Sequence, residues 1–207
     1  TTFCVLRMLH ETATRGGGSL SVSLGCCTKR QTEMGDHCLC PKGAAARVVE
    51  FTDIKCGHCA RLIAELKDME RLLEPGTFSI EPRQFPLDHK CNKAVPAEIS
   101  DDSNVRCTAA KALICLEGRD EFWTAQRRMF MVGPSLSKEK VLEIAGELAQ
   151  DKPGIETCVA SKETQTKLDQ DVAYAMKYEL EGTPLVIING RKVESIGALI
   201  YAMILAK

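Results

Sequence analysis

The chain has 207 residues, of which 44% are hydrophobic and 27% are charged, and its formal net charge at pH 7 is −1. This composition is typical of a soluble globular protein with one large domain, or with a domain and an appendage. The near-zero charge provides no basic surface for nucleic acid or for an acidic membrane, so neither is expected as a partner. The longest apolar stretch near an end, residues 196–206, is too short to cross a bilayer.

Eleven cysteines are many for a chain kept in a reducing cytosol. They predict an oxidising location, periplasmic or otherwise extracytoplasmic. No signal peptide is visible from Thr1 onward and no initiator Met is present, which fits a mature or trimmed chain. An odd number of cysteines leaves at least one free thiol or one bridge to another chain.

Residues 1–43 form a small cysteine-rich segment that differs from the rest of the chain. The alternation of apolar residues over 19–24 predicts a short strand. The segment has few apolar residues, so it must be stapled or docked to be ordered. Its cysteines are Cys4, Cys26, Cys27, Cys38 and Cys40. Two disulfides among the last four are favoured over zinc, because adjacent and alternate cysteines strain a tetrahedral site.

Residues 44–52 predict a buried strand, the first element of the remaining chain. An amphipathic helix follows over 60–74, and Pro75-Gly76 ends it. Residues 77–87 predict the next strand. These three elements form a βαβ unit whose crossover should be right-handed.

Residues 103–178 predict several helices with apolar stripes at helical spacing. Breaks are expected at Gly133-Pro134 and at Pro153-Gly154.

The chain ends with strand 184–188, a turn at Asn189-Gly190, strand 191–194 and an apolar helix from Ile196. Asn-Gly between apolar runs is a strong two-residue hairpin signal. The order βαβ, helices, ββα predicts an α/β fold over residues 44–207. Its core is thioredoxin-like, with a helical insertion at about 103–178.

The motif Cys56-Gly57-His58-Cys59 lies where the first strand meets the first helix. Two cysteines separated by two residues at such a junction are the unit of a thiol–disulfide exchanger. The helix N-terminus favours the thiolate of Cys56, and Cys59 lies one turn away, where it can resolve a mixed disulfide. A zinc site would need a second ligand pair. The strand-to-helix setting favours redox chemistry over zinc and over a purely structural disulfide, with no cofactor and no metal.

The ordered set of motifs resembles the DsbA-like family of extracytoplasmic thiol–disulfide oxidoreductases. It is most similar to the branch of DsbG-like proteins and of thioredoxin domains partnered with vitamin K epoxide reductase. The resemblance covers about residues 45–207. The matching segments are Val49-Glu50-Phe51, Cys56-Gly57-His58-Cys59, Phe85-Pro86-Leu87-Asp88, Phe122-Trp123, Gly182-Thr183-Pro184 and Asn189-Gly190-Arg191.

The resemblance implies a role for each residue of this site. Cys56 would be the solvent-facing nucleophile and Cys59 the buried resolving thiol, while His58 would tune the pKa of Cys56. Thr183-Pro184 would be a cis peptide that faces the thiols. The backbone of Thr183 would then bind an extended client chain by β-augmentation.

Glu50 lies six residues before Cys56, where the family often places a buried acid near the resolving thiol. A proton-handling role is favoured over a solvated charge at the strand end. The pair Gly57-His58 departs from the Pro-His of strong bacterial oxidants and matches that of eukaryotic protein disulfide isomerases. Segment 1–43 matches no part of the family, and it is expected to be a capping hairpin or an arm that forms a homodimer, as in isomerase relatives.

Cys107 and Cys115 lie eight residues apart on a predicted helix. That separation is a rise of about 12 Å, too far for one disulfide. The expected pairings are Cys91 with Cys107 and Cys115 with Cys158, and the alternative is inert buried thiols. The remaining histidines are expected on the surface: His10, His37 and His89.

The sequence therefore predicts an enzyme, an extracytoplasmic protein disulfide oxidoreductase that acts as oxidase or isomerase. Its clients would be unfolded or partly folded cysteine-containing proteins, bound through mixed disulfides with the Cys56/Cys59 pair. A membrane redox partner would reset the pair. The alternative is a chaperone or assembly-type binding module in which the CxxC disulfide is structural.

Overall fold

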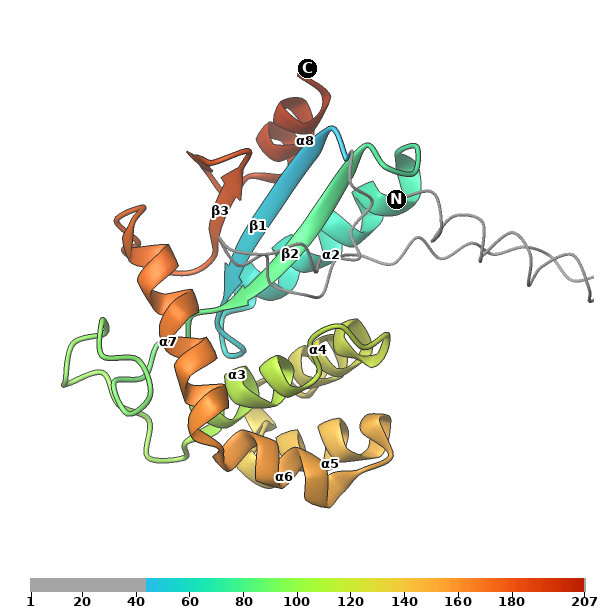
Figure 1. Ribbon diagram of the computed structural model, residues 1–207. Coiled ribbons are helices and arrows are strands. Elements are labelled where there is room, and N and C mark those ends of the chain that lie inside the picture. Colours follow the sequence, from blue (N-terminus) through green and yellow to red (C-terminus); the bar gives the residue numbers. More distant parts are fainter. Residues whose placement is uncertain (1–43, 207) are drawn as a thin grey trace, which may run out of the picture.

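A computed structural model describes residues 44–206 (Figure 1). The expected strand, disulfides and dimerisation arm of residues 1–43 lie outside the described residues. The boundary predicted at residue 44 stays a prediction.

The described residues form one mixed sheet with the strand order β2-β1-β3-β4. β1 (Ala46–Thr52) and β2 (Phe78–Gln84) run parallel, as a βαβ unit requires. β3 (Leu185–Ile188) pairs antiparallel with the other edge of β1, and β4 (Arg191–Val193) pairs antiparallel with β3. β1 is therefore a central strand, and its C-terminal end meets the beginning of β3.

The turn between β3 and β4 is the predicted Asn-Gly hairpin. Asn189 and Gly190 have φ angles of 49° and 81°, which is the left-handed conformation that two-residue hairpin turns of type I′ require. Asn189 also receives a 2.8 Å hydrogen bond at its side-chain oxygen from the backbone N–H of Arg47. This contact ties the turn to the start of β1.

One face of the sheet is covered by α2 (Gly57–Leu72) and α8 (Gly197–Leu205) (Figure 1). Val48 of β1, Leu66 of α2 and Ile200 of α8 belong to the same buried cluster. The apolar stripe predicted for residues 60–74 faces this cluster, so the amphipathic pattern is explained by packing on β1.

α7 (Lys162–Met176) covers the opposite face, where Leu168 packs in one cluster with Phe51 of β1. A buried polar link adds to this packing. The carboxylate of Asp171 on α7 accepts a hydrogen bond from the Arg83 side chain of β2 at 3.1 Å and from the backbone N–H of Gln84 at 2.9 Å. Helices on both faces explain why every position of β1 except Arg47 is buried.

The helical insertion forms a second layer beyond one end of the sheet (Figure 1). Its elements before α7 are α3 (Val105–Cys115), α4 (Glu121–Val132), a 3₁₀ turn η1 (Gly133–Ser135), α5 (Lys138–Ala149) and α6 (Lys152–Ala160). These helices share a core of their own, in which Leu113, Met129 and Ile144 are fully buried. Side chains of Ser137, Asp151 and Ser161 cap α5, α6 and α7 by accepting backbone N–H groups.

The sequence predicts Pro153-Gly154 as a break, but both residues lie in the first turn of α6. Proline is allowed there because the first N–H groups of a helix have no intrahelical partner. Asp151 accepts the N–H of Gly154 at 2.9 Å and sets the start of the helix. His89 also differs from its surface expectation, since it is half-buried with Nδ1 2.7 Å from the carbonyl oxygen of Val95.

Both expected disulfides of the described region are present. Cys91 pairs with Cys107, and Cys115 pairs with Cys158. The first joins the loop after β2 to α3, and the second joins α3 to α6. The insertion is therefore stapled at both ends of α3.

We expect the Cys115–Cys158 disulfide to contribute strongly to stability. It closes a sequence separation of 43 residues, for which chain-entropy arguments give about 4 kcal/mol. The double variant Cys115→Ala/Cys158→Ala should therefore lose a free energy of unfolding of that order, measured by guanidinium denaturation with the denaturant slope fitted separately for each protein, because the released unfolded chain exposes more surface. A loss below about 1 kcal/mol would contradict this expectation.

Candidate active site

Cys56 lies at the N-cap of α2, directly after the short loop that follows β1. Its Sγ accepts the backbone N–H of Cys59 at 3.2 Å, and in the thiol form it donates to the carbonyl oxygen of Thr183 at 3.4 Å. Cys56 is half-buried. The sulfur is thus held between a helix N-terminus and the loop before β3.

This setting lowers the pKa of the Cys56 thiol to about 5. The main cause is a hydrogen bond from the Cys59 thiol, and the backbone N–H groups of Cys59 and His58 act in the same direction, while burial opposes them. Hydrogen bonds to a sulfur favour its charged form, as do the free N–H groups at a helix start. At neutral pH Cys56 is therefore a thiolate.

Cys59 has the opposite character. It is fully buried on the inner side of α2 and is a free thiol, like Cys56. Burial, its hydrogen bond to Cys56 and the charge of Glu50 all raise the pKa of Cys59 far above its ordinary value. The two thiols lie one helical turn apart, but their surroundings make Cys56 an accessible thiolate and Cys59 a buried, protonated thiol.

Glu50 is completely buried, so the alternative of a solvated charge at the strand end is wrong. Side chains alternate between the two faces of a strand. Glu50 follows Val48 by two residues and therefore points to the face that α2 covers. Neither of its carboxylate oxygens has a hydrogen-bond partner among the described residues. Burial and the nearby charge of Cys56 raise the pKa of Glu50 well above its ordinary value.

The Thr183–Pro184 peptide bond is cis, as the resemblance implied. Both residues are half-buried, and β3 begins immediately after them at Leu185. The buried hydroxyl oxygen of Thr183 has no hydrogen-bond partner among the described residues. The loop therefore presents polar groups of Thr183 beside Cys56, outside the hydrogen-bond ladder of the sheet.

Gly57 and His58 are exposed at the start of α2. A Cβ placed on Gly57 would meet no atom within 4 Å, and its backbone is not in the left-handed region. The structure does not require glycine here, and the first helical position also tolerates proline. The backbone N–H of His58 is the smallest of the influences that lower the pKa of the Cys56 thiol, and a role for the His58 side chain stays a prediction.

Zinc at the CxxC motif would need a further pair of ligands nearby. Within residues 44–206 no three His, Cys, Asp or Glu side chains are grouped so as to hold a metal ion. In the same part of the chain, no helix has the length and apolar character to span a membrane.

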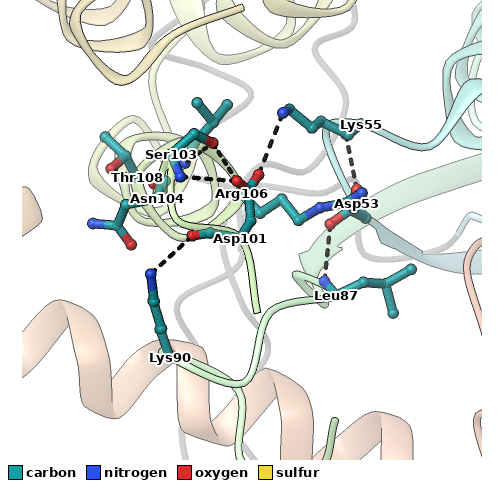
Figure 2. Close-up of polar contacts among 10 residues, drawn as sticks. Asp53, Lys55, Leu87, Lys90, Asp101, Ser103, Asn104, Arg106 and Thr108 are labelled. Atoms are coloured by element: carbon teal, nitrogen blue, oxygen red, sulfur yellow. Dashed lines mark hydrogen bonds and ion pairs between the residues drawn. The ribbon is translucent and has the colours of Figure 1, made fainter. Parts of the chain in front are cut away.

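Sequence reasoning missed the polar network behind the CxxC loop (Figure 2). Asp53 is fully buried and forms an ion pair with Arg106 of α3, and Lys55 forms a second ion pair with Asp101 at 3.3 Å. The only signal in the sequence was an acidic residue three positions before Cys56. Arg106, the ion-pair partner of Asp53, lies 53 positions further along the chain, and no periodicity connects the two.

The fold and the paired thiols define a thioredoxin-like protein with a CxxC centre and a helical insertion. A family model described as thioredoxin matches residues 33–201, and the chain belongs to this family. It is 26% identical over 158 residues to the "Probable disulfide bond formation protein D" of Bacillus anthracis. The match covers 71% of this chain and 66% of that relative, so the chain spans slightly less than two thirds of the relative's length.

Solved structures show the same fold. BdbD from Bacillus subtilis superposes with a TM-score of 0.61 at 17% identity, covering 79% of this chain and 87% of that one. The thiol–disulfide exchange protein alpha-DsbA2 from Wolbachia pipientis gives 0.61 at 16% identity, with 79% and 82% covered. A thioredoxin-like oxidoreductase from Silicibacter pomeroyi gives 0.58 at 20% identity, with 73% and 78% covered. The DsbA-like fold with its helical insertion is thereby confirmed.

We expect Cys56 to be the only rapidly alkylated thiol of the pair. With a pKa of about 5, its iodoacetamide rate should be constant near neutral pH and fall as the pH drops through that value, because the thiolate is the nucleophile. Cys59 should stay unlabelled. In Cys59→Ala the midpoint should rise, since the thiol that donates the main hydrogen bond to Cys56 is removed. Equal labelling of both thiols, or a midpoint near about 8.5, would contradict the assignment.

Proposed function

We propose that the protein catalyses thiol–disulfide exchange on cysteine-containing client proteins outside the cytoplasm, acting as an oxidase through the Cys56/Cys59 pair. The observation that carries this proposal is the difference between the two thiols. One is an accessible thiolate beside the Thr183 loop, and the other is buried and protonated. A purely structural disulfide requires no such difference.

The reaction runs through a mixed disulfide. A client thiolate attacks Sγ of Cys56 in the Cys56–Cys59 disulfide, the S–S bond breaks, and Cys59 leaves as a thiolate that takes up a proton. A second client thiolate then attacks the client sulfur of the mixed disulfide. The client leaves with a new disulfide and two electrons remain on the enzyme, as the Cys56 thiolate and the Cys59 thiol. A membrane redox partner removes these electrons.

The low pKa of Cys56 supports the oxidising direction. Exchange is faster when the leaving thiol has a low pKa, and a stabilised thiolate favours the reduced form of the enzyme pair. The hydrogen bonds that stabilise the Cys56 thiolate exist only in the reduced pair. They are lost when the disulfide forms, so they disfavour the disulfide. The pair gives its disulfide to clients more readily than it takes one.

Glu50 is proposed to handle the proton of Cys59. It is the acidic residue whose charge acts on the Cys59 thiol, and its raised pKa keeps a proton available in a site that excludes water. A buried thiolate that leaves without a proton would be an unpaired buried charge, which is costly. Protonated Glu50 supplies the proton in the oxidising direction and accepts one in the reverse direction.

The extracytoplasmic location is supported by the two disulfides that staple the insertion. Disulfides of this kind persist in oxidising compartments and are rare in a reducing cytosol. Client binding is supported by the Thr183 loop. Its position before β3 leaves it free to pair with an extended cysteine-bearing segment.

Cys59→Ser should accumulate mixed disulfides with a client that contains a disulfide, whereas Cys56→Ser should not. Without Cys59 no thiol lies one turn from Cys56 to resolve the adduct, and without Cys56 the remaining thiol is buried. Non-reducing gels of both variants with a cysteine-bearing client measure this. Comparable adducts from both would overturn the two roles, and absence of any catalysed exchange by the unaltered protein would favour a binding module.

Glu50→Gln should slow the steps in which Cys59 gains or loses a proton, and it should leave the attack of the reduced Cys56 thiolate on a peptide disulfide nearly unchanged. General-base assistance is worth roughly a hundredfold at its lower end, so resolution of a preformed mixed disulfide should slow by about that factor. Stopped-flow exchange of the reduced protein with a disulfide-containing peptide separates the two phases, the attack by Cys56 and the resolution by Cys59. The Cys56 alkylation rate at neutral pH serves as the internal control, and equal slowing of both phases would argue against a proton-handling role.

A further inference from the structure

Asp53 is a buried carboxylate in the bend between β1 and Cys56 (Figure 2). Its side chain is 0% exposed. The N-cap of α2 is Cys56, so Asp53 does not cap that helix. Its Oδ1 accepts the backbone N–H of Lys55 at 2.8 Å and its Oδ2 accepts that of Leu87 at 2.9 Å. The side chain of Arg106 forms an ion pair with Oδ1. Both oxygens are therefore occupied by donors from three separate segments.

The same residue also holds Cys56 through its backbone. The carbonyl oxygen of Asp53 accepts the N–H of Cys56 at 3.0 Å. Together with the bond from Lys55 N–H to Oδ1, this contact folds the loop tightly around the Asp53 carboxylate. The bend delivers Cys56 to the N-cap of α2, where its sulfur meets the N–H groups of the first helical turn.

Arg106 connects this loop to the helical insertion. It is the second residue of α3, its side chain is 23% exposed, and it precedes Cys107 of the Cys91–Cys107 disulfide. A second link runs in parallel, from Lys55 to Asp101 at 3.3 Å. Leu87 approaches from the loop after β2. The loop that joins β1 to α2 is thus bonded to α3 and to the loop between β2 and α3.

A carboxylate is the one small side chain that satisfies this arrangement. It offers acceptors on both oxygens and carries the charge that pairs with guanidinium. The amide of asparagine has almost the same size but replaces one acceptor with a donor. That NH₂ group would face either a backbone N–H or the guanidinium group, and one donor would lose its partner.

We propose that Asp53 is a positioning residue for Cys56 and that Arg106 makes the helical insertion part of the redox centre by holding Asp53 in place. The Asp53 carboxylate acts by fixing the backbone of the loop, and its described partners are Lys55, Leu87 and Arg106, not the Cys56 sulfur. The significance of the inference for catalysis rests on the proposed function, but the placement of Cys56 can be measured without it.

The test compares five substitutions in the full chain. Asp53→Asn is matched by Asp171→Asn, because Asp171 is also fully buried and accepts an arginine and a backbone N–H, but between α7 and β2. Arg106→Gln is matched by Arg128→Gln, which removes an exposed ion pair to Glu147. Arg106→Lys keeps the charge and serves as the rescue variant. The titratable groups that act on Cys56 (Glu50 and Cys59) and its neighbour His58 stay unchanged in every variant.

The readouts are the pH midpoint of Cys56 alkylation, the glutathione equilibrium of the Cys56–Cys59 pair and the thermal unfolding midpoint. In Asp53→Asn the alkylation midpoint should rise by about one pH unit, the usual scale of environmental shifts in folded proteins. Arg106→Gln should give a smaller rise that Arg106→Lys largely reverses. The equilibrium should shift toward the disulfide form in the same order, because the thiolate is less stabilised. Asp171→Asn should lower thermal stability without moving the alkylation midpoint, and Arg128→Gln should change neither.

An unchanged alkylation midpoint in folded Asp53→Asn and Arg106→Gln would overturn the proposal and leave Asp53 as a structural ion pair. The same shift in Asp171→Asn would also overturn it, because general loosening would then explain the effect. If Asp53→Asn does not fold, the folded Arg106 variants decide by the same midpoint. A protein that shows the predicted shifts but catalyses no exchange would retain the positioning role and lose the proposed function.

Discussion

The antiparallel pairing of β3 with the end of β1 is the constraint on which the candidate site depends. Phe51 pairs with Leu185, so the C-terminal end of one strand lies at the N-terminal end of the other. The segments that continue from these two points carry Cys56 and Thr183, which are 127 positions apart in the chain and 3.4 Å apart at their contacting atoms. The whole helical insertion lies between them in sequence. A fold that closes this distance can accept a large insertion without losing the site.

Burial then gives the two cysteine side chains of the motif different reactivity. At the start of α2, Cys56 faces the Thr183 loop and Cys59 faces the sheet. Cys59 and Glu50 are both fully buried between α2 and the sheet. Hydrogen bonds stabilise the charge on the first sulfur, and desolvation forbids it on the second. The unpartnered oxygens of Glu50 are a destabilising feature of the core, retained at the one place where the proposed chemistry needs a mobile proton.

Local patterns predicted the fold well because its elements have strong signals, such as an amphipathic stripe for α2 and Asn189-Gly190 for the hairpin, whereas the cis peptide was implied by the family resemblance. The helical spacing of Cys107 and Cys115 excluded a bridge between these two, but it left their pairing with Cys91 and Cys158 open against buried free thiols until the structure showed both disulfides. The prediction of a break at Pro153-Gly154 was wrong, because a proline and a glycine that usually interrupt a helix lie here in the first turn of α6. The Asp53–Arg106 contact joins segments with no common pattern, so only tertiary structure reveals it.

The exposed dipeptide between the cysteines has a consequence for how proteins of this design diverge. Gly57 has no atom near its absent Cβ, and His58 is likewise exposed on the outer side of the first helical turn. Substitutions here change the groups nearest the Cys56 sulfur but remove no core contact. These two positions are therefore places where the surface beside the reactive thiol can change while the packing of α2 against the sheet stays the same.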